Sequence, residues 1–74
     1  MEQVVLNIIN SIREAKNESA VSVLKAEDKL REDLGLTSFD LAELTVRIED
    51  EYGIDIFETG LVNTVGEIYA KLQK

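Results

Sequence analysis

The sequence lacks several residue types on which many enzyme and metal sites depend. It contains no cysteine, so it can form neither a disulfide framework nor a thiolate metal site. It contains no histidine, which removes the commonest general base and the commonest ligand of transition metals. Proline is also absent. These absences argue against a hydrolase, a redox protein or a zinc module, and we expect no metal site.

The sequence also has no long apolar segment and no basic N-terminal stretch. No apolar run approaches the roughly 18 residues that a membrane-spanning helix needs. The chain begins Met1-Glu2-Gln3, without the positive residues that open a signal peptide. We therefore expect a cytoplasmic protein with no membrane role.

Positive charge is scarce. The 74 residues include 15 Asp and Glu but only 8 Lys and Arg, so the formal net charge is -7. A chain of this charge repels phosphate backbones and anionic lipids, so neither nucleic acid nor membrane is an expected partner. It attracts basic protein surfaces, although the acidity could equally serve only to keep a small domain soluble.

The length and composition indicate one domain spanning residues 1–74, which is all-α. Apolar residues make up 45% and charged residues 31% of the chain, as in globular rather than disordered proteins. Helical periodicity of apolar residues predicts helices from Glu2 to about Lys16, from Ser38 to Tyr52, and from the Thr64 region to about Leu72. With one short irregular helical turn expected within residues 54–62, the predicted architecture is a small antiparallel helical bundle of three main helices plus one short helix.

Local signals fix the ends of the second helix. Thr37 is a suitable N-cap, and Asp40 at the third helical position completes a Thr-x-x-Asp capping box. Gly53 is suited to the left-handed position that follows a helix. Residues 17–37 have no single period, and we expect them to pack across the helices, with a helical turn within residues 26–34 that Gly35 closes.

The second helix carries two apolar stripes. The stripe expected to face the core consists of Leu41, Leu44, Thr45, Ile48 and Tyr52. Phe39, Ala42 and Val46 form a second stripe, here named the outer stripe, about 140° away around the helix. The outer stripe either fills a wide core or forms an exposed apolar patch rimmed by acidic residues, as a docking surface requires.

No catalytic constellation emerges from the remaining residues. The acidic windows that begin at Asp28 and Asp40 lack the ligand pattern of a calcium-binding loop. The serines have no histidine partner, and there is no glycine-rich loop to hold phosphates. We therefore do not expect an enzyme.

Ser38 differs from the other serines because it stands at the start of a predicted helix. The helix dipole and the free N–H groups there favour an anion, so a phosphodiester on Ser38 Oγ would lie in a favourable field. The alternative is that Ser38 only begins or caps the helix, because serine is strongly preferred there.

The sequence from Asp33 to Leu44 resembles the prosthetic-group site of the acyl carrier proteins. The resemblance continues through Ile48–Ile56, ends with Thr64–Ile68, and covers roughly Leu30 to Leu72. In that family a serine at the start of the second helix carries 4′-phosphopantetheine, which comes from coenzyme A, and Ser38 occupies that position. The terminal thiol of the arm holds acyl groups as thioesters, so this covalent cofactor would supply the sulfur that the chain lacks.

Two departures from the family pattern stand near this serine. The usual Asp-Ser-Leu is Thr37-Ser38-Phe39 here, where Thr37 can still act as a cap and Phe39 enlarges the apolar surface. Arg47 adds a cation to an acidic face. It either pairs with Glu43, four residues earlier, or selects a particular partner.

The resemblance implies a free-standing, monomeric carrier that presents thioester-bound acyl intermediates to partner enzymes, as in fatty acid or polyketide biosynthesis. Its expected partners are a phosphopantetheinyl transferase and the acyl- or aminoacyl-loading and transferring enzymes, which would dock weakly through basic surfaces. The residues expected to dock them are Phe39, Asp40, Ala42, Glu43, Val46, Arg47, Glu49 and Asp50. The alternatives are an aminoacyl or peptidyl carrier that serves an adenylating enzyme, and an acidic interaction module that carries no arm.

Overall fold

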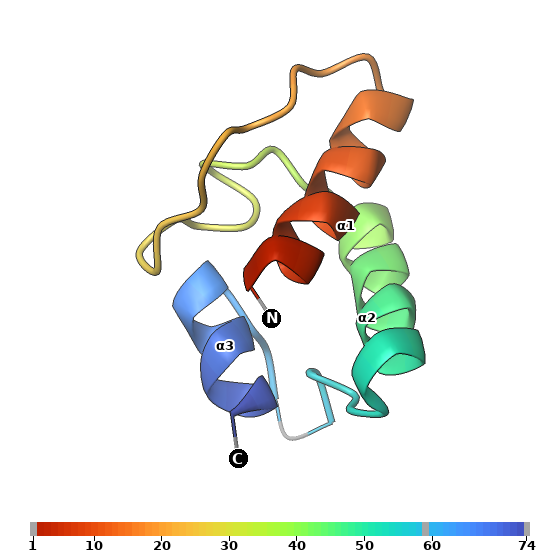
Figure 1. Ribbon diagram of the computed structural model, residues 1–74, viewed down its shortest axis with the longest axis vertical. Coiled ribbons are helices and arrows are strands. Elements are labelled where there is room, and N and C mark those ends of the chain that lie inside the picture. The colour runs from red at the N-terminus through yellow and green to blue at the C-terminus, as the bar shows by residue number, and fades with distance from the viewer. Residues whose placement is uncertain (1, 59, 74) are drawn as a thin grey trace.

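The computed structural model describes residues 2–58 and 60–73 as a helical fold. The helices are α1 (Glu2–Ala15), α2 (Ser38–Tyr52) and α3 (Val65–Leu72). Helices α1 and α2 pack against each other and run in opposite directions, while α3 lies across from them (Figure 1). The described residues form no β-strand, only one isolated antiparallel bridge. The predicted all-α class is confirmed.

Helix α2 has the predicted ends because its caps form as expected. The Thr37 side chain accepts a hydrogen bond from the Asp40 backbone N–H, and the Asp40 carboxylate accepts one from the Thr37 N–H. Gly53 has a φ of 70° and donates its N–H to the Glu49 carbonyl, which ends the helix. The capping box and the left-handed glycine thus fix both boundaries of the helix that begins with Ser38.

The other two helices also follow local signals. Helix α1 stops at Ala15, slightly before the predicted end, because Asn17 takes a left-handed conformation with a φ of 65°. Helix α3 begins after a second capping box, in which Thr64 and Glu67 exchange side-chain to backbone hydrogen bonds.

The long connection from α1 to α2 contains the predicted helical turn. Gly35 donates its N–H to the Arg31 carbonyl at 3.1 Å, and Leu36 donates to the Leu30 carbonyl at 3.0 Å. With a φ of 72° at Gly35, its bond to Arg31 forms the αL motif, in which the residue after the helical turn donates to the carbonyl four residues earlier. The turn therefore ends in a fixed geometry two residues before the start of α2.

The expected short fourth helix is not found among the described residues between Ile54 and Val62. They form a turn, in which Glu58 donates its N–H to the Asp55 carbonyl at 3.1 Å. The Asp55 side chain also accepts the Phe57 N–H at 3.0 Å, an alternative to helical pairing that Asp readily provides. Gly60, with a φ of 142°, interrupts the segment, and Thr59 lies outside the described residues.

The core draws side chains from all three helices and from both connections. Its buried apolar members are Val5, Ile8, Ile9, Ile12, Leu30, Leu34, Leu36, Leu44, Ile48, Ile56, Val62, Val65 and Ile68. The connection from α1 to α2 contributes three of these leucines, so it packs across the helices as predicted.

The same connection is also attached to the start of α3 through backbone hydrogen bonds. Leu30 donates to the Asn63 carbonyl at 2.8 Å, and Val65 donates to the Asp28 carbonyl at 3.0 Å. Gly66 donates to the Ala26 carbonyl at 2.8 Å, and an added Cβ at Gly66 would lie 3.0 Å from that oxygen. This close approach explains a glycine inside the first turn of a helix, where it otherwise costs stability.

No helix in the described part of the chain combines the length and the apolar character needed to cross a membrane.

Candidate functional site

Ser38 is exposed at the first position of α2. Thr37 is the N-cap, so the Ser38 hydroxyl is not occupied in capping the helix. Instead, Ser38 Oγ accepts a hydrogen bond of 2.9 Å from Arg31 Nη1, which reaches it from the turn before α2. The hydroxyl thus lies on the surface, at a helix N-terminus and beside a guanidinium group.

An open groove of about 280 Å³ lies beside α2 and has Ser38 in its lining. Its lining comes from the turn before α2, from α2 itself and from the connection to α3, and consists of Arg31, Ser38, Leu41, Ala42, Thr45, Phe57 and Leu61. Most of these side chains are apolar, and Leu61 is 84% exposed at its rim. A polar edge at Ser38 and Arg31 therefore borders an apolar surface.

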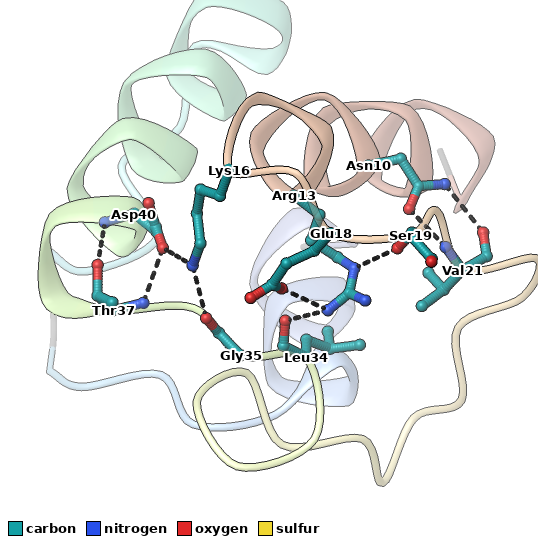
Figure 2. A network of polar contacts seen from close by, with 10 residues as sticks. All are labelled: Asn10, Arg13, Lys16, Glu18, Ser19, Val21, Leu34, Gly35, Thr37 and Asp40. Atoms are coloured by element: carbon teal, nitrogen blue, oxygen red, sulfur yellow. Dashed lines mark hydrogen bonds and ion pairs between the residues drawn. The ribbon is translucent and has the colours of Figure 1, made fainter.

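Asp40 holds the start of α2 in place from the inside. Lys16 Nζ lies 2.6 Å from Asp40 Oδ2 and 2.8 Å from the Gly35 carbonyl oxygen, as Figure 2 shows. Burial by itself would raise the pKa of the Asp40 carboxyl, but hydrogen bonds from Lys16 and Thr37 outweigh it and lower the pKa. The carboxylate is therefore ionised, and the Lys16 ammonium compensates its charge close to Ser38.

This geometry corrects the expected role of Asp40 as a docking contact. Asp40 is only 6% exposed, and its carboxylate is engaged by Lys16 and by the Thr37 backbone. A partner enzyme cannot reach it without opening the cap of α2. Asp40 is a structural residue that positions Ser38.

Polar side chains of α1 fix the loop that follows it. Arg13 donates to the carbonyls of Leu34 and Ser19 and pairs with Glu18, whose carboxylate lies 3.3 Å away. Asn10 exchanges two hydrogen bonds with the backbone of Val21, at 2.8 and 2.9 Å (Figure 2). The turn that carries Arg31 therefore ends against a helix rather than in a mobile loop.

The outer stripe faces solvent. Phe39 is 81% exposed, Val46 is 64% exposed, and Ala42 between them is exposed as well. On the opposite stripe Leu44 and Ile48 are fully buried. The prediction that α2 has one buried and one exposed apolar stripe is confirmed, and the wide-core alternative is wrong.

Acidic residues border this exposed stripe. Glu43, Glu49 and Asp50 are all exposed on α2. The described residues hold no group of three or more His, Cys, Asp or Glu side chains arranged to bind a metal ion. These carboxylates form a solvated negative rim around the outer stripe.

The Arg47 guanidinium contacts side chains of its own chain. Its Nη2 lies 3.1 Å from Glu43 Oε2, and its Nη1 donates to Ser11 Oγ of α1 at 3.0 Å. The structure therefore agrees with the prediction that Arg47 pairs with Glu43. The pair is about two-fifths exposed, so we expect it to contribute little to stability.

Comparison with known proteins places this site in context. Residues 3–72 match a family described as "Phosphopantetheine attachment site". The chain is 36% identical over 55 residues to a protein of Thermotoga maritima named "Acyl carrier protein", a match that covers 72% of this chain and 68% of that protein.

A second relative has the same name. Over 44 residues the chain is 46% identical to the "Acyl carrier protein" of Saccharopolyspora erythraea, covering 57% of this chain and 46% of that protein. No solved structure matches the chain significantly.

Proposed function

Because the chain belongs to the acyl carrier protein family, whose members share a phosphopantetheine attachment site, we propose that it carries acyl intermediates on an arm attached to Ser38. The cofactor of the family is covalent 4′-phosphopantetheine. The observation that carries the proposal is the exposed Ser38 hydroxyl at the start of α2, outside the capping box and at the edge of an apolar groove.

The residues around Ser38 fit a phosphodiester. The first N–H groups of α2 and the Arg31 guanidinium supply hydrogen-bond donors and positive charge. The nearest buried carboxylate, Asp40, is compensated by Lys16 at 2.6 Å. A negative group on Ser38 therefore meets favourable rather than repulsive charge.

Attachment uses the Ser38 hydroxyl as the nucleophile. Ser38 Oγ bonds to the phosphorus of coenzyme A that bears the pantetheine, the phosphoanhydride bond breaks so that 3′,5′-ADP departs as the leaving group, and the hydroxyl proton is released to solvent. A phosphopantetheinyl transferase provides the catalysis, and this chain provides a rigid, accessible nucleophile. Once bound, the arm supplies the thiol that forms thioesters, which no residue of this chain can provide.

The groove supports an acyl cargo. Leu41, Phe57 and Leu61 give it an apolar lining next to the attachment point. An aliphatic chain gains from covering such a surface, whereas the charged amine of an aminoacyl group would lose hydration there. We therefore favour acyl over aminoacyl cargo.

Partner enzymes dock on the outer stripe and its acidic rim. Phe39 and Val46 provide the exposed apolar contacts, and Glu43, Glu49 and Asp50 provide negative charge around them. Rim charges mainly accelerate association with a basic surface, and a small apolar patch keeps the complex weak. Fast exchange of this kind suits a carrier that must visit several enzymes.

The attachment site is tested by intact-mass measurement. After incubation with coenzyme A and a phosphopantetheinyl transferase, the wild type should gain the mass of one phosphopantetheine moiety, and Ser38→Ala should gain none. Ser22→Ala, which changes another exposed serine, should be modified like the wild type. Modification of Ser38→Ala, or no modification of the wild type by any transferase tried, contradicts the proposal.

The docking surface is tested by stopped-flow association with the transferase at several salt concentrations. Asp50→Lys should slow association and flatten its salt dependence, while Glu27→Lys, an equal charge reversal in the first connection, should change both less. Phe39→Ala should mainly speed dissociation, because it removes apolar area that the complex buries. Equal rates for all variants would rule out docking at this surface.

A further inference from the structure

Arg31 stands at a fixed position beside the attachment point. It belongs to the turn that the αL motif closes at Gly35. Its neighbour Leu30 is fully buried, and Leu34 is only 3% exposed. The backbone that carries Arg31 is therefore anchored in the core, while its side chain reaches Ser38 Oγ at 2.9 Å.

The Arg31 charge has no acidic partner in the described part of the chain. The ion pairs seen there include those of Arg13 with Glu18, Lys16 with Asp40, and Arg47 with Glu43. Arg31 instead donates to a neutral hydroxyl. The chain has a net charge of -7 and many carboxylates, yet the Arg31 guanidinium forms an ion pair with none of those described. It can therefore bind an anion placed next to Ser38.

We propose that Arg31 binds the phosphate of the arm once the arm is attached to Ser38, an inference that rests on the proposed attachment there. On attachment the Ser38 hydroxyl becomes an ester oxygen, and two charged oxygens appear on the phosphorus bonded to it. The guanidinium already lies within hydrogen-bond distance of Oγ and needs only a small side-chain adjustment to meet them. Bonds from arginine to a phosphate are charge-assisted and roughly twice as strong as neutral ones.

The contact would restrict the start of the arm. Arg31 and Ser38 both line the groove, so a phosphate bound between them stays at its edge. The arm then leaves this edge next to Leu41 and Ala42 rather than from a freely rotating side chain. Arg31 acts as a positioning residue that favours arm orientations along the groove.

Phosphorus NMR of the modified protein tests this contact directly. Relative to the wild type, Arg31→Gln should narrow the ³¹P resonance and move it towards that of the same phosphodiester in the modified protein unfolded in urea. Lys29→Gln removes the same charge from the same turn, but its backbone contacts remain, so its ³¹P resonance should match the wild type. Salt near 1 M should move the wild-type resonance towards that of Arg31→Gln, because exposed charge pairs are screened. Identical resonances for the wild type and Arg31→Gln would overturn the proposal.

A second measurement needs no change at Arg31. The Arg31 side-chain N–H signals should shift between the unmodified and the modified protein, and should not shift in Ser38→Ala treated with the same enzyme. If the transferase does not modify Arg31→Gln, the contact is tested by the Arg31 signals of the unmodified and modified wild type alone. Unchanged Arg31 signals would then refute the contact. Intact mass separates the two hypotheses: an unmodified wild type refutes attachment at Ser38, whereas a modified wild type with unchanged Arg31 signals refutes only the role of Arg31.

Discussion

Two truncations in α2 should lower the free energy of unfolding in the reverse order of the number of atoms that they remove. Ile48→Val deletes one methyl-sized group from a fully buried side chain, and Val46→Ala deletes two from a side chain that is 64% exposed. The smaller deletion should cost about 0.5–1.5 kcal/mol, because it leaves a cavity in the core. Ile48→Ala is less suitable, since its cost of about 2–5 kcal/mol approaches the whole stability expected of so small a domain.

The cost at Val46 can be worked from its exposure. Complete burial of a valine side chain contributes about 1.5–3 kcal/mol, of which about one third, roughly 0.5–1 kcal/mol, applies to a side chain that is 64% exposed. Alanine recovers up to about 0.7 kcal/mol through its higher helix propensity. Val46→Ala should therefore change the free energy of unfolding by no more than about 0.5 kcal/mol.

Urea denaturation followed by circular dichroism measures both changes. With an m-value of about 1 kcal/mol/M, Ile48→Val should lower the midpoint by about 0.5–1.5 M and Val46→Ala by less than about 0.5 M. Equal m-values would show that both variants unfold from the same compact state. A midpoint shift for Val46→Ala as large as that for Ile48→Val would refute the assignment of the outer stripe to the surface.

Three further predictions concern charge and backbone. Asp40→Asn should cost about 1.5–3 kcal/mol at neutral pH. Because the pKa of Asp40 is lowered in the folded state, the stabilisation by its carboxylate is present above the unfolded pKa of about 4 and is lost as the pH falls through the folded pKa. The urea midpoint of Asp40→Asn should therefore fall less on acidification than that of the wild type. Gly35→Ala and Gly53→Ala should each cost about 1–2 kcal/mol, since both glycines have a φ near 70°. The substitution at Gly35 should cost more, because its new Cβ would lie 3.2 Å from Glu18 Oε1, whereas Gly53 has open space. A smaller loss of stability for Gly35→Ala in thermal melts would contradict this. Finally, the net charge of -7 predicts that salt or millimolar divalent cations raise Tm, and a Tm that is flat across such titrations would refute the idea that self-repulsion limits stability.

The sequence was sufficient wherever local chemistry decides the structure. The bounds of α2 follow from the Thr37 and Asp40 capping box and from Gly53, because each makes its hydrogen bonds within a few residues of itself. The exposure of Phe39 and Val46 followed from helical periodicity, which fixes the faces of a helix once one face is known to be buried.

Contacts between distant segments could not be predicted in this way. Asp40 was expected at the surface because its pairing with Lys16 joins residues far apart in the sequence, and burial depends on how α1 meets α2. The bond from Arg31 to Ser38 depends on how the intervening turn folds back, which Gly35 makes possible but does not by itself specify. The residues after Ile54 form a turn because an Asp side chain competed with helical hydrogen bonds.

The attachment of the first connection to α3 has a consequence for how the molecule opens. Helix α3 has only eight residues, and isolated helices shorter than about 12–15 residues are marginal in water. The N–H groups of Val65 and Gly66, which in most helices would face solvent, donate to Asp28 and Ala26. In native-state hydrogen exchange these two amides should therefore be protected at the end of the helix that ordinarily frays, and they should exchange together with Leu30 as one cooperative unit.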